Sequence, residues 1–577
     1  MWGARLEVAM ADLKTNVLYY GDNLDILRHH IPEESIDLIY LDPPFNSQRS
    51  YNVLFRESSG VGSGAQMEAF EDTWHWGAAA QAVYEEVVTG PHQRVARMLQ
   101  AMVEGLGHND VTAYLSMMAI RLVELHRVLK PTGSTYLHCD PTAGPYLRVL
   151  MDSVFGPKIF RNEIVWRRTG AHNKGRRFAP IHDTLLFYTK GDIHTWTFPT
   201  RPYMRGHVEE FFVKDAQGYR TKYFGNVLTG SGVRGGESGK PWRGFDPTAK
   251  SRHWAIPKRV LDEITEDLTG LGQHQKLDRL YELGYIKIVP GEAWPTYEHR
   301  IAPNDGQPVG DIWAFQPYTR GTVFGTDKGI DEDVRWLGTR DRERLGYPTQ
   351  KPLTLLERII NASSNPGDIV LDPFCGCGTA VHAAQKLDRQ WIGIDITHLA
   401  IGLIRRRVQD AFQGLAIEVM GEPKDLAGAE YLAASKPTQF EYWVVDKLDA
   451  KPTGGKGPDL DGVMPFVEFG GKVKRAVISV KGTKSVNPEM IREVLGALGP
   501  GKPIGILVTL TKPTKGMITQ AVAAGSYESD GIKYERVQIM TVEDILKGKR
   551  PHVPPPVSPF AKAPAEKKKK GKQQPLL

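Results

Sequence analysis

At 577 residues the chain is too long for one hydrophobic core, so two to four domains are expected. Its 41% hydrophobic and 24% charged residues are typical of a globular protein, and a net charge of +6 permits nucleic-acid binding without requiring it. Three cysteines argue against a disulfide framework and for a cytoplasmic location. No hydrophobic run is long enough to span a membrane, and no segment has the features of a signal peptide.

Strands and helices alternate in the first third of the chain. Strands are expected at 17–20, 36–41, 134–137 and 184–188, and helices at 23–30, 111–130 and 146–155. This alternation indicates βαβ units and a largely parallel sheet.

The second expected strand leads directly into Asp42-Pro43-Pro44-Phe45, at the carboxyl end where open α/β sheets bind ligands. The amine of a DNA base is a weak nucleophile because its lone pair is delocalised into the ring. Asp42 could accept one hydrogen bond from such an amine, and the carbonyl of Pro43 in this rigid Pro-Pro turn another. Phe45 offers a flat face to an extruded base. For the tetrapeptide alone, a Pro-Pro turn that only ends the strand is an equally good interpretation.

The alternation weakens between about 195 and 345, a stretch rich in Gly, Trp, Tyr and Arg. It resumes with a helix at 353–362, a strand at 367–371, a helix to about 387 and a strand at 391–394. The Gly-rich loop Asp372 to Thr379 lies between the strand at 367–371 and the helix that ends near 387.

This loop has the features of a cofactor site. Gly376 and Gly378 would allow backbone N–H groups to approach a ligand closely, and Asp395, after the next strand, could accept hydrogen bonds from ribose hydroxyls. Gly-x-Gly alone usually marks a tight turn, but the flanking strand, helix and acid favour cofactor binding. Cys375 and Cys377 lack the spacing of a zinc site.

Methylation of carbon 5 of cytosine needs a cysteine nucleophile. No cysteine lies near Asp42 in the sequence, and Cys139 has no matching context. We therefore expect direct transfer to an amine, without a covalent enzyme intermediate.

A second α/β unit begins near residue 440. Strands are expected at 476–480, 504–510 and 535–540, and helices at 488–498 and 515–524. After Lys549 the chain becomes Pro-rich and then Lys-rich, which predicts a disordered tail.

These motifs resemble those of the DNA amino-methyltransferases of the β arrangement, in which the catalytic motif precedes the target-recognition region and the cofactor loop follows. Gly21 to Asp25 is similar to the segment before the catalytic motif, and Gly346 to Pro352 to the one leading into the loop. The resemblance implies a Rossmann-like sheet, S-adenosylmethionine as cofactor and double-stranded DNA as substrate, with a homodimer as one option. Its implied cofactor residues are Lys351, Pro352, Asp372, Pro373, Phe374, Gly376, Gly378, Thr379 and Asp395; its implied catalytic residues are Asp42, Pro43, Pro44 and Phe45.

The resemblance also sets domain boundaries. It implies a catalytic part at 14–194, a target-recognition region at 195–345, a cofactor-binding part at 346–430, a smaller α/β domain at 440–549 and a disordered basic tail at 550–577. Asp rather than Ser at position 42 favours N6 of adenine over N4 of cytosine, which stays the alternative.

In the expected target-recognition region, Lys240, Arg243 and Arg252 alternate with Trp242 and Trp254 and would suit phosphate and base contacts. For each of these residues taken singly, ordinary surface charge or core packing is the stronger expectation.

The unit at 440–549 resembles the PD-(D/E)xK nuclease fold of the Mrr-like kind, through Asp461 and the strand ending Ser479-Val480-Lys481. Ser479 stands where this family has an acid or Gln, and Mg²⁺ would be a cofactor only if the domain still cleaves DNA. For this unit, a DNA-binding or regulatory remnant and an active nuclease in a self-contained restriction-modification protein both stay open. For the whole chain, a catalytically inert DNA-binding regulator would predict damaged motifs, and both main motifs are intact. We expect removal of residues 440–577 to leave methylation largely intact.

Overall fold

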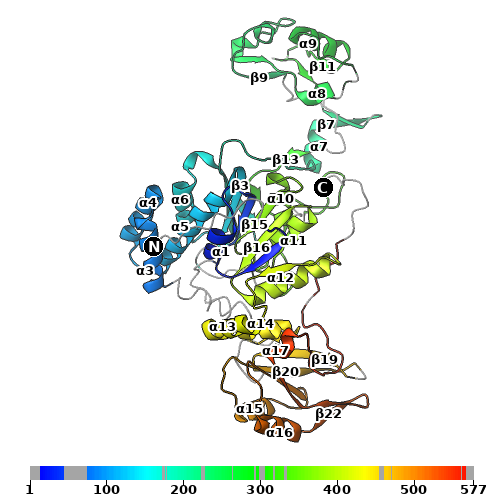
Figure 1. Cartoon of the computed structure of the whole chain (residues 1–577). Coiled ribbons are helices and arrows are strands. Elements are labelled where there is room, and N and C mark those ends of the chain that lie inside the picture. The colour runs from blue at the N-terminus through cyan, green and yellow to red at the C-terminus, as the bar shows by residue number, and fades with distance from the viewer. Residues whose placement is uncertain are drawn as a thin grey trace. The chain divides into compact units, whose positions relative to one another are not determined.

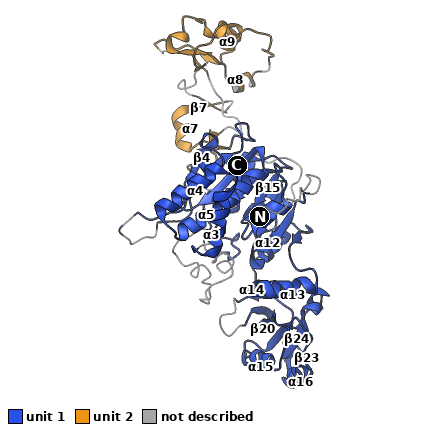
Figure 2. Ribbon diagram, turned by 60° about the vertical axis from the view of Figure 1, so that its left-hand side comes forward, with its two compact units in different colours: residues 1–198, 310–315, 333–570 blue, residues 199–309, 316–332, 571–577 orange. Residues whose placement is uncertain are grey.

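The structure of the protein is a computed structural model. It describes residues 13–44, 75–171, 176, 178–216, 218–221, 228–262, 264, 266–291, 294–297, 306–315, 319–330, 334–338, 340–347, 349–453, 460–468, 471–560 and 562–566. The chain forms two compact units (Figure 2). The first comprises residues 1–198, 310–315 and 333–570, and the second residues 199–309, 316–332 and 571–577.

A nine-stranded sheet forms the centre of the first unit. The strands lie in the order β14 (Ile312–Trp313), β4 (Phe160–Arg167), β5 (His182–Thr189), β3 (Leu129–Cys139), β2 (Ile36–Leu41), β15 (Ile369–Asp372), β16 (Gln390–Asp395), β1 (Val17–Tyr20) and β17 (Glu418–Met420). Strand β5 runs antiparallel to both of its neighbours, and every other adjacent pair is parallel. The predicted Rossmann-like, largely parallel sheet is confirmed.

Strands β2 and β15 pair at the middle of this sheet, although they are far apart in the sequence. Leu38 lies opposite Val370, and Ile39 opposite Leu371. The carboxylate of Asp37 fixes the register, because it accepts a 2.9 Å hydrogen bond from the N–H of Ile369, which is 332 residues away. Parallel pairing brings the carboxyl ends of β2 and β15 to the same edge of the sheet.

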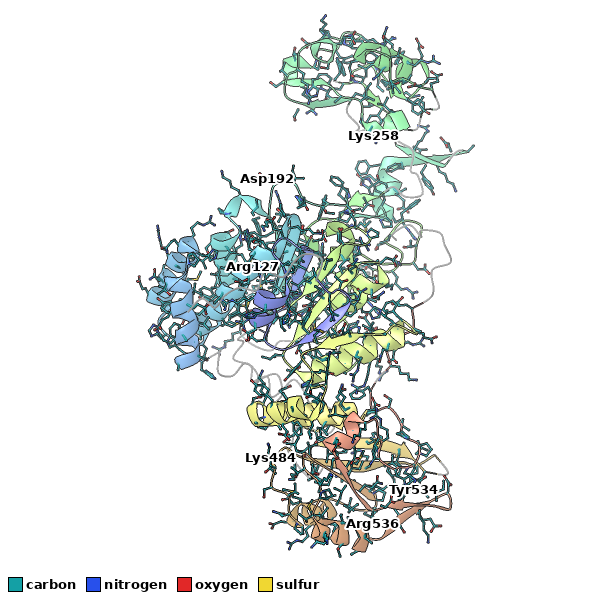
Figure 3. The ribbon with its side chains drawn as sticks, in the orientation of Figure 1. Arg127, Asp192, Lys258, Lys484, Tyr534 and Arg536 are labelled. Atoms are coloured by element: carbon teal, nitrogen blue, oxygen red, sulfur yellow. The ribbon has the colours of Figure 1, made fainter. Side chains whose placement is uncertain are left out.

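Helices cover both faces of the sheet (Figure 1). One face is covered by α1 (Asn23–His30), α5 (Asp110–Val128) and α6 (Gly144–Val154), which pack on alternate residues of the strands. The other face is covered by α10 (Leu353–Ser363), α11 (Thr379–Lys386) and α12 (His398–Ala411). Helices α3 (Ala78–Thr89) and α4 (Gln93–Leu106) pack outside α5. Arg127 of α5, labelled in Figure 3, donates to the carbonyls of Leu27 and Ile31 and thereby holds the end of α1. No helix in the described part of the chain has the length and apolar composition needed to cross a membrane.

The second unit is built around its own small core. The members of that core are Leu228, Trp242, Trp254, Val260, Leu277, Leu280, Ile286 and Tyr297. Six of them come from β10 (Arg252–Trp254), α8 (Lys258–Asp262), α9 (Gln273–Glu282), β11 (Ile286–Lys287) and β12 (Thr296–Tyr297). Leu228 directly precedes β9 (Thr229–Ser231), which pairs with β10, and Trp242 lies between β9 and β10 in the sequence. Two further pairs, β6 (Thr200–Arg201) with β13 (Gln307–Pro308) and β7 (Phe212–Asp215) with β8 (Gly218–Thr221), and α7 (Arg205–Phe211) also belong to this unit.

The C-terminal part of the first unit has a separate five-stranded sheet. Its order is β18 (Lys451–Pro452), β19 (Gly462–Val467), β20 (Val473–Lys481), β21 (Ile504–Thr509) and β24 (Val537–Thr541). The first three strands form an antiparallel meander, and the last three run parallel. Helices α15 (Glu489–Gly496) and α16 (Lys515–Ala523) share one core with β21 and β24.

Two helices connect the two sheets. Helix α13 (Leu426–Ser435) is followed by α14 (Pro437–Lys447), which packs against both β20 and α12. Asp446 of α14 is buried and forms ion pairs with Arg405 and Arg406 of α12, at 2.5 and 2.6 Å. The unit expected to be separable from residue 440 is therefore joined to the methyltransferase-like part by buried charge pairs.

The chain after residue 550 differs from the expected disordered tail. Residues 555–557 lie along β19, where the N–H of Val557 donates to the carbonyl of Pro465. Residues 557–560 and 562–566, here called the C-terminal strap, then contact α11 and α12. The lysines at 567–570 lie outside the described residues, so the predicted disorder there stays a prediction.

Candidate active site

A cleft of about 900 Å³, counted with its solvent-open part, lies at the carboxyl ends of β1, β2, β15 and β16. The residues that line it are Gly21, Asp22, Asn23, Tyr40, Asp42, Pro43, Pro44, Tyr347, Thr349, Gln350, Lys351, Leu356, Asp372, Pro373, Phe374, Cys375, Gly376, Cys377, Thr379, Ala380, Asp395 and Ile396. The two sequence motifs that were expected to bind base and cofactor thus share one cavity.

Asp42 leaves the end of β2 and forms an ion pair with Lys351, whose ammonium group donates to Asp42 Oδ2. The two side chains are 16% and 13% exposed, so water screens the pair only weakly. The sequence assigned Lys351 to the cofactor. The structure shows it instead holding one oxygen of the Asp42 carboxylate, while Lys351 still lines the cleft.

Asp395 organises the Gly-rich loop. Its Oδ2 accepts a 3.0 Å hydrogen bond from the N–H of Gly376, and its Oδ1 accepts from the N–H and hydroxyl of Thr397 at 2.9 and 2.8 Å. Burial raises the pKa of Asp395 to about 6, although these three donors favour the ionised form. Near neutral pH the carboxylate is therefore ionised, and it faces the cleft.

Gly378 is not among the residues that line the cleft, and its expected role toward the cofactor stays a prediction. Its φ is +74°, and a Cβ there would lie 2.7 Å from Cγ2 of Ile404 in α12. Gly376, with φ +50°, packs under the ring of Tyr347. The two glycines are needed for left-handed backbone and for close packing against the protein itself.

Arg121 is a residue that the sequence analysis missed. It lies buried on α5 and donates to Asp22 Oδ1 at 2.8 Å and to Asn23 Oδ1 at 2.6 Å. Asn23 in turn donates to the carbonyl of Pro373 at 2.8 Å. This chain of hydrogen bonds ties the end of β1 to the cofactor loop. Nothing in the helical periodicity around Arg121 distinguishes it from a surface arginine.

Other expected site residues fall in three groups. Pro43, Pro44, Asp372, Pro373, Phe374 and Thr379 line the cleft, and their roles in catalysis or cofactor binding stay predictions. Pro352 lies outside the lining and is the N-cap of α10. Phe45 lies outside the described residues, so its stacking role stays a prediction.

The charges of the cleft fit a cation. Among the described residues that line it, four are aspartates (Asp22, Asp42, Asp372, Asp395) and one is a lysine (Lys351). Burial raises the pKa of Asp372 well above its usual range, and the Asp42 and Asp395 carboxylates add to this effect. Arg121 pairs with Asp22 and Lys351 with Asp42, so a sulfonium carrying an amino-acid tail would mainly stabilise the ionised forms of Asp372 and Asp395. The cavity therefore matches the charge of S-adenosylmethionine.

In the second unit, the candidate DNA contacts behave differently from one another. Trp242 and Trp254 are buried in the core, which agrees with the expectation that each of them, taken singly, serves core packing. Arg252 bonds internally to Thr229, and Arg243 pairs with Asp278 at 2.9 Å. Lys240 has an exposed side chain. Their binding of DNA stays a prediction.

In the C-terminal sheet, the expected nuclease residues do gather at the end of β20. Asp461 Oδ2 accepts a 2.6 Å hydrogen bond from the N–H of Val480, and the buried Ser479 lies beside this carboxylate. Lys481 pairs with Glu493 of α15 at 2.8 Å. Glu468, another acid of this sheet, follows the far end of β19 and pairs with Lys474. The described residues contain no cluster of three or more metal-binding side chains.

Comparison with known proteins assigns the family. The model of the DNA methylase family N6_N4_Mtase matches residues 36–405, more than half of the chain. The DNA adenine methyltransferase YhdJ of Escherichia coli strain K12 is 48% identical over 416 residues, which cover 72% of this chain and 90% of YhdJ. The chain therefore belongs to this DNA methylase family.

The similarity is narrower for other relatives. The type II methyltransferase M.EcaI of Enterobacter cloacae is 30% identical over 304 residues, which span 51% of this chain but only 57% of M.EcaI. The crystal structure of an M1.HpyAVI–SAM complex covers 68% of this chain and 98% of its own, at 13% identity and a TM-score of 0.28. That score is too low to support a conclusion.

Replacing Gly378 by Val should destabilise the fold. A β-branched residue at this left-handed φ costs about 2 kcal/mol, and the contact with Ile404 adds about 1–3 kcal/mol of overpacking. Gly414→Val is the matched control, because its φ is also positive (+83°) but nothing lies within 4 Å of its Cβ. Thermal unfolding should show a larger loss for Gly378→Val. Equal losses in the two variants would contradict the packing role.

Cofactor affinity should depend on the protonation of Asp395. With a pKa of about 6 the carboxylate is ionised at pH 7.5 and mostly protonated at pH 5.5. Protonation removes an acceptor for ribose hydroxyls, so affinity for S-adenosylhomocysteine should be high above pH 6 and fall about fourfold between pH 7.5 and 5.5. Calorimetry checks this. Asp395→Asn should bind more weakly without this pH dependence, and persistence of the same slope in that variant would assign the effect to another group.

Proposed function

We propose that the protein transfers the methyl group of S-adenosylmethionine to the N6 amine of adenine in double-stranded DNA. The observation that carries this proposal is that Asp42 and the loop Asp372–Thr379 line one cleft, because β2 and β15 pair at the centre of the sheet. Bound in this cleft, the cofactor supplies an electrophilic methyl group on a sulfonium.

Asp42 activates the amine in this proposal. Its Oδ2 is held by Lys351, so its Oδ1 remains to accept a hydrogen bond from the N–H of the base. The carbonyl of Pro43 accepts the second N–H. With both hydrogens directed at acceptors, the nitrogen lone pair points out of the ring plane toward the methyl group. The transfer forms an N–C bond and breaks an S–C bond, and the amine then loses one proton, for which Asp42 is the nearest carboxylate acceptor.

Adenine is favoured over cytosine for two reasons. Asp rather than Ser occupies position 42, and the relative YhdJ is a DNA adenine methyltransferase. N4 of cytosine is the alternative target, since the same two acceptors would suit its amine. The second unit is the proposed target-recognition region, with the exposed Lys240 as its first candidate for a phosphate contact.

The C-terminal sheet binds DNA without cutting it in this proposal. A catalytic Mg²⁺ needs several anionic oxygens, and Ser479 supplies only a neutral hydroxyl. Glu493 is near enough to raise the pKa of Asp461, but it pairs with Lys481. The acid that would complete a metal site is therefore lacking among the described residues near Asp461.

Asp42→Ala should lower the methyl-transfer rate at least about 100-fold while S-adenosylhomocysteine affinity changes less than about twofold, since Asp42 contacts the base amine. Mass spectrometry of hydrolysed product DNA measures the rate and identifies N6-methyladenine. Glu418→Ala is the control, because Glu418 is an exposed carboxylate paired only with Lys14. Near wild-type transfer by Asp42→Ala would refute its role, and N4-methylcytosine as sole product would change the target base.

The full chain should leave unmethylated plasmid DNA intact in the presence of Mg²⁺, because the described residues hold no cluster of metal-binding side chains around Asp461. A plasmid digestion assay with the wild type and with Lys481→Ala tests this. Linearisation by the wild type that disappears in Lys481→Ala would show an active nuclease, and the protein would then both modify and restrict DNA.

A further inference from the structure

The C-terminal strap links the C-terminal sheet to the outside of the cofactor loop. At its start, Val557 bonds to Pro465 beside β19. At its end, the N–H of Glu566 donates to the carbonyl of Ala411 at 2.9 Å, and the N–H of Ala563 donates to Asp410 at 3.3 Å. The strap is therefore fixed to the end of α12 by backbone donors.

Phe560 anchors the middle of the strap. Its ring packs with a cluster that contains Tyr347, Cys377 and Leu403, and the guanidinium of Arg406 lies 3.9 Å from the ring centroid. Tyr347 and Cys377 also line the cleft. Phe560 thus packs on a cluster that includes two residues of the cleft wall.

Glu566 begins a chain of hydrogen bonds that ends at the loop. Its Oε1 lies 3.0 Å from Nε2 of His382, and Nδ1 of His382 lies 3.1 Å from Nε of Arg407. Arginine only donates, so Nδ1 accepts and Nε2 carries the hydrogen given to Glu566. Nη1 of Arg407 donates to Oγ1 of Thr379 at 2.9 Å. Thr379 lines the cleft.

His382 and Arg407 are 2% exposed and thus shielded from water, whereas the Glu566 side chain at the end of this hydrogen-bond chain is 23% exposed. Such buried links are sensitive to the loss of one member, because a removed acceptor leaves a buried donor without a partner. Glu566 also pairs with Lys386 at 3.3 Å, but Lys386 keeps a second carboxylate, Glu357, at 2.9 Å. The hydrogen bond that Glu566 accepts from His382 therefore matters more than the negative charge of Glu566.

We propose that Glu566 is a positioning residue for cofactor binding, acting through His382 and Arg407 on Thr379, and that the strap thereby couples the C-terminal sheet to the cofactor loop. This inference rests on the proposed function, because it takes the loop as the S-adenosylmethionine site. The coupling also reverses the expectation that residues 440–577 are dispensable for methylation, since their removal deletes Glu566 and Phe560.

Three full-length variants test the proposal by calorimetry with S-adenosylhomocysteine and by steady-state methylation. Glu566→Ala should raise the Kd about fivefold and raise KM for the cofactor similarly, with kcat at saturating cofactor within about twofold of wild type. Glu566→Gln should stay within about twofold of wild type, because the amide oxygen still accepts from His382. Glu418→Ala is the control for loss of an exposed carboxylate.

Each outcome decides the matter. Weaker binding by Glu566→Ala with recovery in Glu566→Gln supports the proposal. Unchanged affinity in Glu566→Ala, even with a lower Tm, would mean that the strap is structural only and would overturn it. Equal weakening in both Glu566 variants would overturn the hydrogen-bond route. A folded wild type that binds no S-adenosylhomocysteine would overturn the proposed function as well, which separates that failure from a failure of the strap alone.

Discussion

The parallel pairing of β2 with β15 is the constraint on which the rest of the structure depends. It joins two segments that are far apart in the sequence and sets their registers through Asp37, so that Asp42 and Asp372 leave the same edge of the sheet. If β2 slipped by one residue along β15, the side chains of β2 would exchange faces of the sheet. The Asp-Pro-Pro turn after β2 would then be displaced from the Gly-rich loop. The segment between these strands also supplies β3, β4 and β5 to the sheet and Tyr347 and Lys351 to the cleft, and only its residues 199–309 and 316–332 form a separate unit.

Charge then determines what the cleft accepts. The Asp42–Lys351 ion pair and the donors around Asp395 hold carboxylates in a partly enclosed space, where unpaired negative charge is costly. A cationic ligand offsets that cost, and a base amine can use the remaining oxygen of Asp42. In the proposed reaction the same geometry accommodates both substrates of an amine methylation. Cys375 and Cys377 also line the cleft, but burial raises the pKa of both thiols and so disfavours the nucleophilic thiolate.

Sequence patterns predicted the parts of the site that depend on local backbone chemistry. The Asp-Pro-Pro turn, the Gly-rich loop and the acid at the end of β16 each follow a strand, and the sheet brought all three together as expected. Side chains that act across elements could not be predicted in this way. Arg121 reaches Asp22 from α5, Arg407 reaches Thr379 from α12, and the clash partner of Gly378 comes from α12. In each case a tertiary contact gives the residue its role. The local sequence around such a residue does not differ from that around an arginine on the surface or a glycine in an ordinary turn, so it could not reveal the contact. The C-terminal strap was missed for a similar reason, because its Pro-rich composition is that of an unstructured tail.

The most direct test of the central claim is to express the full chain in cells that lack base methylation and to map modified bases by single-molecule sequencing. The account predicts N6-methyladenine at every copy of one short DNA sequence, and no modified bases when Asp42 is replaced by Ala. DNA without any modified base, from cells that contain the folded wild-type protein with its cofactor bound, would contradict the account.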